Sequence, residues 1–227
     1  MKTIFITGAT SGIGRATALA LSHPDHRLVL IGRREDRLKE VASQCIHAVA
    51  VPLDVSDTGS VAGLKDLMGD ASAVALVNNA GIGEFGPFHE QSWASISSQI
   101  SVNLLGAMAC VHALLPQMIS LGSGQIVQVT SIVSDRHRFA HAEAYTAGKA
   151  GLSGFTRSLR ESVRGAGIRV TEIIPGAVDT EIWGEHSPPR SEMLTAEHVA
   201  QAIAFVINAP EGQVIEEMLL TPPKGIL

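Results

Sequence analysis

Cysteines, aromatic residues and charges are all scarce in this sequence of 227 residues. Its only cysteines, Cys45 and Cys110, lie in apolar segments without a histidine or acidic pattern around them, which favours ordinary core packing over a reactive or bridged thiol. Charged residues make up 17% of the chain and hydrophobic residues 45%, a balance that excludes a disordered protein and supplies a sizeable core. We therefore expect a globular protein of the reducing cytoplasm.

Signals for three kinds of partner or destination are also missing. The formal net charge is −5, and lysine and arginine are scattered along the chain, so a nucleic acid is not an expected partner. The first apolar run, at residues 3–6, is too short for a signal peptide and is followed at once by Thr7 and Gly8. We expect no stretch that approaches the roughly 18 uncharged apolar residues of a membrane-spanning helix. A membrane is therefore not an expected partner either.

Short apolar runs alternate with longer amphipathic segments along the whole chain. The runs predict strands at residues 3–6, 27–31, 47–51, 74–77, 125–129, 169–174 and 214–220. Helical spacing predicts helices at residues 13–21, 35–42, 61–68, 93–119, 144–163 and 196–207. This alternation is typical of a doubly wound α/β fold, a parallel sheet with helices on both faces. We predict a single domain over residues 1–227, with a mobile substrate loop at 180–190.

A glycine-rich turn joins the first predicted strand to the first predicted helix. Gly8, Gly12 and Gly14 have the spacing G-x-x-x-G-x-G. Glycines let the backbone turn sharply and approach a pyrophosphate, whose charge is favoured by the free N–H groups and the positive end of a helix. The spacing differs from the G-x-G-x-x-G fingerprint, and a tight strand-to-helix connection would need the same glycines. Taken alone, the turn leaves both interpretations open.

Tyr145 and Lys149 are four residues apart in a predicted helix, so their side chains lie on one face, a single turn from each other. A free phenol titrates at about pH 10, and a neighbouring ammonium would favour phenolate and lower that pKa. Tyr145 is therefore a candidate general acid or base. In an anonymous helix the same pair would be a half-buried tyrosine beside a lysine whose ammonium reaches solvent.

Four spaced motifs follow one another along the chain: the glycine-rich turn, Asn78-Asn79-Ala80-Gly81, Tyr145-x-x-x-Lys149 and Pro175-Gly176. Together they resemble the classical short-chain dehydrogenase/reductase family over nearly the whole chain. The resemblance implies a Rossmann-type domain that transfers hydride between a nicotinamide cofactor and a carbonyl or alcohol compound. It implies cofactor binding by Gly8, Thr10, Ser11, Gly12, Ile13, Gly14, Asp54, Asn79, Ala80, Gly81, Tyr145, Lys149, Pro175, Gly176, Val178 and Thr180.

The same resemblance implies four catalytic residues, Asn103, Ser131, Tyr145 and Lys149. Ser131 ends a strand-like run where the family's serine binds the reacting oxygen, although Ser134 lies nearby as a rival. Tyr145 would exchange a proton with that oxygen, its pKa lowered by Lys149 and the nicotinamide charge, while Lys149 would hold ribose hydroxyls. Asn103 would bend its helix and link Lys149 to a water relay. The alternative for Asn103 is a helix-interior amide that bonds to backbone.

Basic residues after the second predicted strand bear on the choice of cofactor. Gly32 occupies the position where an acidic residue would bind the ribose 2′-hydroxyl of NAD, and Arg33 follows it directly. A guanidinium pairs well with phosphate, so NADP(H) is favoured and NAD(H) stays possible. Arg34 and Arg37 are interpreted as surface charges. By the resemblance, Asp54 contacts the adenine amino group, with a turn or helix cap as its alternative, and Thr180 contacts the nicotinamide carboxamide.

Weaker patterns concern the substrate and a metal. Segment 135–143 is expected to line the substrate pocket with polar and cationic groups, and an aromatic content of 4% suggests no large stacking platform. Trp183 is assigned to the substrate loop. The C-terminal segment 216–222 resembles a subgroup that includes small hydroxy-acid dehydrogenases, which hints at a polar substrate. His137 and His141 are four residues apart, but no third ligand is apparent, so no metal is expected.

The leading hypothesis is an NADP(H)-dependent oxidoreductase acting on a small carbonyl or alcohol substrate, with Tyr145 as general acid or base. The alternative is a regulatory or scaffold protein that binds NADP(H) without turnover, because a fold alone does not establish activity. A related epimerase or dehydratase is a third option, but the chain is short for the extra C-terminal domain such enzymes commonly carry. Helices 93–119 and 144–163 resemble those that pair across subunits in the family, so a homodimer or homotetramer is expected.

Overall fold

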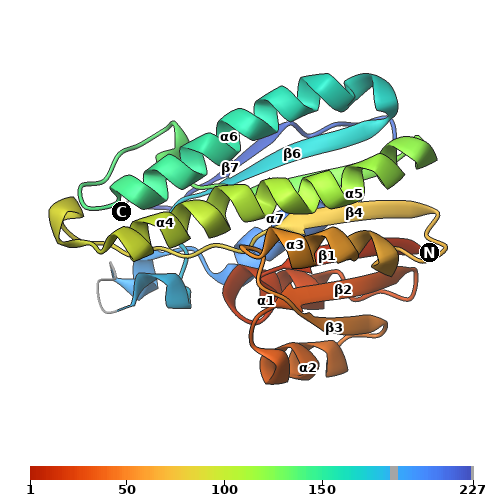
Figure 1. The fold of residues 1–227 in the computed structure, drawn as a ribbon, viewed down its shortest axis with the longest axis horizontal. Coiled ribbons are helices and arrows are strands. Elements are labelled where there is room, and N and C mark those ends of the chain that lie inside the picture. Colours follow the sequence, from red (N-terminus) through yellow and green to blue (C-terminus); the bar gives the residue numbers. More distant parts are fainter. Residues whose placement is uncertain (185–188, 226–227) are drawn as a thin grey trace.

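The computed structural model describes residues 1–184 and 189–225, and these form a seven-stranded sheet in which paired strands run parallel (Figure 1). The order across the sheet is β3-β2-β1-β4-β5-β6-β7. The strands are β1 (Lys2–Thr7), β2 (His26–Gly32), β3 (Ala48–Pro52), β4 (Ala73–Asn78), β5 (Gly124–Val129), β6 (Ile168–Pro175) and β7 (Glu217–Leu220). Each predicted strand is present, and the predicted doubly wound α/β fold is confirmed.

Helices cover both faces of the sheet. The first face carries α1 (Gly12–Ala20), α2 (Glu35–Ser43) and α7 (Ala196–Ile207), and the second carries α3 (Thr58–Val61), α5 (Ala107–Leu121) and α6 (Glu143–Val163). In β1, the side chains of Ile4 and Ile6 belong to the first core layer and that of Phe5 to the second. Successive side chains of a strand point to opposite faces, so the apolar run of β1 contributes to both layers.

The helix predicted over residues 93–119 is interrupted at its centre. α4 (Trp93–Ile100) leads into a turn of π-helix, η3 (Ser101–Gly106), which leads into α5. Such turns are rare and frequently occur at functional sites. The helix predicted at 61–68 is instead the short α3 followed by a 3₁₀ helix, η1 (Ala62–Leu67), since Gly59 and Gly63 weaken helix propensity there.

The helical segment Trp93–Leu121, made of α4, η3 and α5, corrects one expectation from the sequence. It contains no Asp, Glu, Lys or Arg, and an 18-residue window within it has a mean hydropathy of 1.7, so by length and composition it could cross a membrane. In the fold this segment covers the sheet beside α6 (Figure 1). Cys110, Leu114 and Met118 of α5 are fully buried in the second core layer.

Short 3₁₀ turns shape the loops at the ends of the strands. They are η2 (Phe88–Glu90), η4 (Ile132–Ser134), η5 (Arg164–Ala166), η6 (Glu181–Trp183) and η7 (Arg190–Glu192). The substrate loop predicted at 180–190 therefore includes η6 and the first residue of η7. Its residues 185–188 lie outside the described part of the chain.

Candidate active site

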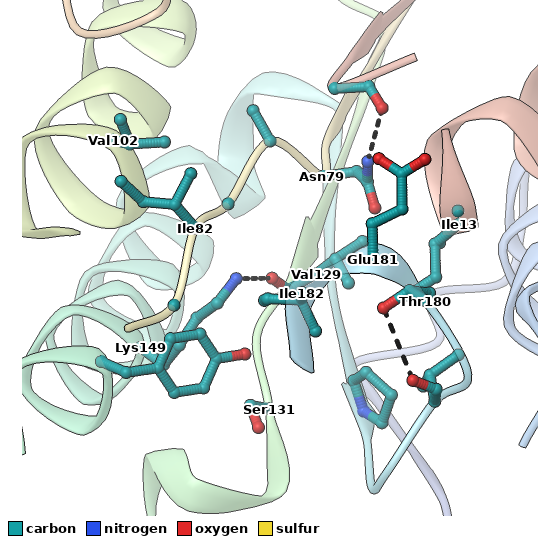
Figure 2. A pocket seen from close by; sticks show the side chains of 18 of the residues that line it. Ile13, Asn79, Ile82, Val102, Val129, Ser131, Lys149, Thr180, Glu181 and Ile182 are labelled. Carbon is teal, nitrogen blue, oxygen red and sulfur yellow. Dashed lines mark hydrogen bonds between the residues drawn. The ribbon is translucent and has the colours of Figure 1, made fainter. Parts of the chain in front are cut away.

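A cavity of about 810 Å³ lies at the carboxyl ends of the strands. The helix after β1 lies on one face of the sheet and the helices after β4 lie on the other, although β1 and β4 are neighbours. Such a reversal opens a crevice in which open α/β sheets bind their ligands. The segments that follow β1 to β6 all contribute lining residues, and Figure 2 shows this cavity from close by.

The glycine-rich turn after β1 forms the floor of one end of the cavity. Gly8 and Gly12 have φ angles of 67° and 50°, a backbone region that favours glycine. A Cβ atom on Gly14 would lie 2.2 Å from the carbonyl oxygen of Gly8, so a larger residue would displace the turn. The cavity is lined by Gly8, Thr10, Ser11, Gly12 and Ile13. Gly14, predicted to bind the cofactor, is not among the described residues that line the cavity. It lies behind the turn, where the lack of a side chain lets the helix pack closely on Gly8 and Asn79.

Thr7 and Asn79 tie the ends of β1 and β4 together. Thr7 Oγ1 accepts hydrogen bonds from the backbone N–H groups of Asn79 and Ala80, each at 3.0 Å. Asn79 Nδ2 donates to the Thr7 carbonyl, also at 3.0 Å. Through this clamp Asn79, Ala80 and Gly81 are brought beside the glycine-rich turn and line the cavity.

Arg34, interpreted from the sequence as a surface charge, is exposed and also lies over the glycine-rich turn. Its guanidinium donates to Thr10 Oγ1 and to Ser11 Oγ, both at 2.8 Å. Glu181 of η6 pairs with Arg34 at 3.0 Å and with Arg37 at 2.9 Å. These two arginines hold the pKa of Glu181 below its usual value. The segment after β6 is thereby connected to the residues that follow β2.

Arg33 and Asp54 line the same end of the cavity. Their charged groups are 3.8 Å apart and partly exposed. Asp54 Oδ1 accepts from the backbone N–H of Ser56 at 2.9 Å and from its hydroxyl at 2.7 Å, which is the turn left open as the alternative for Asp54. Asp54 therefore forms a turn and lines the cavity at once. Arg33 and Arg34 both present guanidinium groups here.

The π-helical turn brings Asn103 against the loop after β4. The buried amide accepts from the N–H of Ile82 at 2.9 Å and donates to the Ile82 carbonyl at 2.8 Å. Asn103 thus bonds to backbone, but to a neighbouring segment and not to its own helix. A Cβ atom on Gly81 would lie 3.1 Å from Asn103 Oδ1 and 3.4 Å from Lys149 Nζ. Asn103 and Lys149 therefore flank Gly81, and Asn103 supports the cavity wall from behind.

Tyr145 and Lys149 both line the cavity from α6. Buried Lys149 donates from Nζ to the Val129 carbonyl at 2.8 Å (Figure 2), and Nζ lies 5.9 Å from the centre of the Tyr145 ring. Burial lowers the pKa of Lys149 to about 8. Burial also raises the pKa of Tyr145 to about 12, against the opposing effect of a hydrogen bond with Ser131. The phenol pKa, expected to fall, is raised because desolvation outweighs the hydrogen bond with Ser131.

Tyr145 is the only tyrosine of the chain, so phenolate absorbance in the ultraviolet reports on this residue alone. We expect little phenolate in the folded protein at about pH 10, where an unfolded chain is half ionised. Because the folded-state pKa is the higher one, the unfolded state loses its proton first. Tyr145 should therefore lower the free energy of unfolding as the pH rises from about 10 to about 12. A spectrophotometric titration that ionises the folded protein below pH 10 would contradict the raised pKa.

The two candidate serines have different positions. Ser131 lines the cavity and its Oγ accepts from the N–H of Val133 at 3.4 Å. Ser134 Oγ accepts from the N–H of Ser131 at 3.3 Å and so serves as a cap of η4. Thr130, the residue before Ser131, donates from its hydroxyl to the fully buried carboxylate of Glu172 at 2.8 Å. The geometry favours Ser131 over Ser134 as the serine that meets a ligand.

The last residue of β6 and the segment after it close the cavity above the glycine-rich turn. Pro175, Gly176, Val178 and Thr180 line it. Thr180 Oγ1 donates to the Val178 carbonyl at 3.5 Å (Figure 2), and a Cβ atom on Gly12 would lie 3.0 Å from Thr180 Cγ2. Motifs from opposite ends of the chain thus meet in one wall.

An aromatic cluster that the sequence did not predict stands beside Tyr145. The ring of Phe85 stacks on Trp183 with centroids 5.5 Å apart, and it meets Tyr145 edge-on at 5.6 Å. The only available signal for Phe85 was its place in the loop after a predicted strand. The sequence predicts that segment 135–143 presents polar and cationic groups to the substrate. Its described residues that line the cavity are instead Phe139, Ala140 and Ala142.

Comparisons with known proteins agree with this arrangement. The short chain dehydrogenase family profile matches residues 2–191. Sulfoacetaldehyde reductase 2 of Chromohalobacter salexigens is 32% identical, over 97% of this chain and 94% of its own. The NADP-dependent 3-hydroxy acid dehydrogenase of Schizosaccharomyces pombe is 32% identical, over 97% and 92%.

A solved structure gives the same result in three dimensions. The alcohol dehydrogenase of Thermococcus sibiricus, complexed with 5-hydroxy-NADP, superposes with a TM-score of 0.87 at 31% identity, over 98% of this chain and 97% of that one. The similarity extends over nearly the entire chain in each of these three proteins. The protein therefore belongs to the short-chain dehydrogenase family of oxidoreductases.

Proposed function

We propose that the protein is an NADP(H)-dependent oxidoreductase that interconverts a small carbonyl compound and its alcohol. One observation carries the proposal: a single cavity is lined by the glycine-rich turn at one end and by Ser131, Tyr145 and Lys149 at the other. A nucleotide bound along the turn would therefore extend toward a group that can donate a proton. Fold membership alone would not support this conclusion.

The residues at the phosphate end fit a dinucleotide that carries a 2′-phosphate. The hydroxyls of Thr10 and Ser11 and the guanidinium groups of Arg33 and Arg34 line this end, and guanidinium is well suited to bind phosphate. One relative is named as NADP-dependent, and the solved alcohol dehydrogenase holds 5-hydroxy-NADP. These observations support NADP(H) over NAD(H).

The side chains at the other end suit proton donation. When bound, the nicotinamide would supply the hydride. Tyr145 has a pKa of about 12 and is protonated at neutral pH, so it can donate to a carbonyl oxygen during reduction. Ser131, which lines the same end of the cavity, would hold the same oxygen. Lys149, fixed by the Val129 carbonyl, would bind ribose hydroxyls, and Asn103 would act as a positioning residue through the Ile82 backbone.

Oxidation of NADPH in the presence of a panel of aldehydes and ketones tests the proposed function. We expect loss of NADPH absorbance with at least one compound, and NADP⁺ reduction when the product alcohol is supplied. NADPH binding without turnover of any compound would contradict the proposal and favour a regulatory or scaffold role.

Arg34 should be a determinant of cofactor choice. We expect Arg34→Ala to raise the Kd for NADPH by roughly tenfold, the equivalent of one charge-assisted hydrogen bond at a partly exposed site, and to leave the Kd for NADH nearly unchanged. Fluorescence titration with each nucleotide measures both constants. Equal losses for the two nucleotides would instead indicate that Arg34 only holds Thr10 and Ser11 in place.

Arg37→Ala is the matched control for this change. Arg37 also pairs with Glu181 but is not among the described residues that line the cavity. The Arg37→Ala change removes the same charge three residues along the chain from Arg34, so NADPH affinity should stay close to that of the wild type. The ratio of the two effects separates phosphate recognition from the general loss of a positive charge.

We also propose that the protein is a cytoplasmic homodimer or homotetramer. The segment from α4 to α5 exposes large apolar side chains, namely Trp93, Leu105, Met108 and Ile119, and apolar patches of this kind mark interaction surfaces. Light scattering should give a mass that is a multiple of the 23.9 kDa chain. A monomer at micromolar concentration would contradict this assembly.

A further inference from the structure

The substrate end of the cavity has an aromatic wall with no unsatisfied polar atom on it. Phe85 and Trp183 stack with an interplanar angle of 24°, and both line the cavity. The Trp183 indole donates from Nε1 to the Val178 carbonyl at 2.8 Å, so its single polar group is already used. The pair lies directly beside Tyr145, whose ring meets Phe85 edge-on at 66°. A carbonyl held at the phenol would place its substituents against this wall.

The other described walls near Tyr145 are also apolar. They are formed by Ile132, Val133, Phe139, Ala140, Ala142 and Ile182. These side chains come from three separate segments, after β5, before α6 and in η6. Together with Phe85 and Trp183 they would exclude water from a bound substituent, a setting that favours apolar surface.

The cations among the described lining residues are already engaged. Arg33 and Arg34 line the other end, where Asp54 and Glu181 lie. Lys149 is beside Tyr145, but its ammonium donates to the Val129 carbonyl and in the proposed function it binds ribose hydroxyls. The sequence of residues 185–188 contains no lysine or arginine. A carboxylate or sulfonate on the substrate would therefore be desolvated without a paired charge, which is costly.

The two arginines of segment 135–143 have partners elsewhere. Arg136 donates to Glu217 at 2.8 Å. Arg138 is exposed and its Nη1 donates to the backbone carbonyls of Val133 at 3.0 Å and His137 at 2.8 Å. Neither is among the described residues that line the cavity. The cations expected from the sequence to bind a polar substrate are therefore engaged with the protein.

From this distribution we propose that the site takes uncharged carbonyl compounds with an apolar or aromatic substituent, held against Phe85 and Trp183, and discriminates against their carboxylate counterparts. The inference rests on the proposed function. In the reaction the carbonyl carbon gains a hydride from NADPH, the π electron pair moves to oxygen, and that oxygen gains the Tyr145 proton. The carbonyl is reduced to an alcohol and NADPH is oxidised to NADP⁺. This class differs from the acidic substrates for which two of the relatives are named.

Two substrates of nearly equal size make the test sharp: methyl benzoylformate, which is neutral, and benzoylformate, which differs by one negative charge. We expect kcat/KM for the ester to exceed that for the acid by roughly tenfold or more, since a buried unpaired charge is strongly disfavoured. Phe85→Ala should raise KM for methyl benzoylformate by about three- to tenfold, the worth of an aromatic contact. KM for methyl pyruvate, which lacks the ring, should change less. Phe205→Ala, on the exposed face of α7, is the matched control.

The outcomes separate this inference from the proposed function. Equal or faster turnover of the acid would overturn the substrate class and leave the oxidoreductase intact. If neither compound is turned over, binding decides: Trp183 is the sole tryptophan of a Trp93→Phe variant, so its emission reports binding of methyl benzoylformate and benzoylformate to the NADPH complex, whose nicotinamide is uncharged. Tighter binding of the ester would support the substrate class although the proposed turnover fails. Equal or tighter binding of the acid, or binding of neither, would overturn it.

Discussion

Replacing Tyr145 by phenylalanine is expected to lower kcat for carbonyl reduction by about 10²- to 10⁴-fold, the range for removal of a general acid, while NADPH affinity changes little. Tyr145 is the chain's only phenol, so no second tyrosine can take over its proton transfer. Phenylalanine keeps the ring that meets Phe85 edge-on, so the cavity wall should persist. Steady-state kinetics with the best substrate of the wild type, beside an NADPH titration, measure both quantities.

The pH dependence of the same variant supplies a second check. The wild-type phenol, with a pKa of about 12, stays protonated through neutral pH, so Tyr145 should not limit reduction there. A basic limb at about pH 8 would instead report Lys149 and should persist in the residual activity of Tyr145→Phe. Activity within a few fold of the wild type would show that another donor, such as water, protonates the substrate, and would remove Tyr145 from the catalytic role.

Gly14→Ala is expected to damage the nucleotide site more than a change of one methyl group suggests. The new Cβ would lie 2.2 Å from the Gly8 carbonyl oxygen and 2.6 Å from Asn79 Nδ2. Since Cβ contacts below 3.0 Å are essentially never found, the turn must move by at least 0.8 Å, the difference between 3.0 and 2.2 Å. We expect a loss of about 1–3 kcal/mol in the free energy of unfolding, and a loss on the order of 10²-fold in kcat/KM from misplacement of the nucleotide.

Gly154→Ala in α6 is the control for this substitution. A Cβ atom on Gly154 would meet nothing within 4 Å, so alanine should add about 0.5–1 kcal/mol of stability through its greater helix propensity. Chemical denaturation and NADPH titration of the two variants give the comparison. If Gly14→Ala matched Gly154→Ala in both, the close packing of the turn on Gly8 and Asn79 would not matter for function.

The sequence predicted the elements and the motif positions because both depend on local patterns. Strand boundaries followed from short apolar runs, and the face shared by Tyr145 and Lys149 followed from helical spacing. The sequence could not show which of two adjacent arginines lies over the turn. Arg34 precedes α2 and bonds to Thr10 and Ser11, a placement set by the direction in which the chain leaves β2. Arg33 lines the cavity beside Asp54, and its contact with the cofactor stays a prediction.

Tertiary contacts determine the other features that sequence analysis missed. Phe85 and Trp183 are far apart in the chain and meet only because the segments after β4 and β6 converge on the same cavity. The composition counts aromatic residues but cannot show that they gather. The raised pKa of Tyr145 depends on burial, which no spacing rule supplies. Similarly, the helical period through Asn103 gave no sign of the π-helical turn that directs its amide to Ile82.

The clamp between Thr7 and Asn79 also constrains the order in which the protein can acquire its site. The bonded residues are 72 positions apart, so their contact must overcome the entropy of closing a long loop and belongs to the slow, non-local class of folding events. A chain growing from its N-terminus has the glycine-rich turn early but lacks the partner strand until β4 has formed. A nucleotide that recognises the completed crevice would therefore stabilise only chains that have passed this step, adding to native stability by mass action.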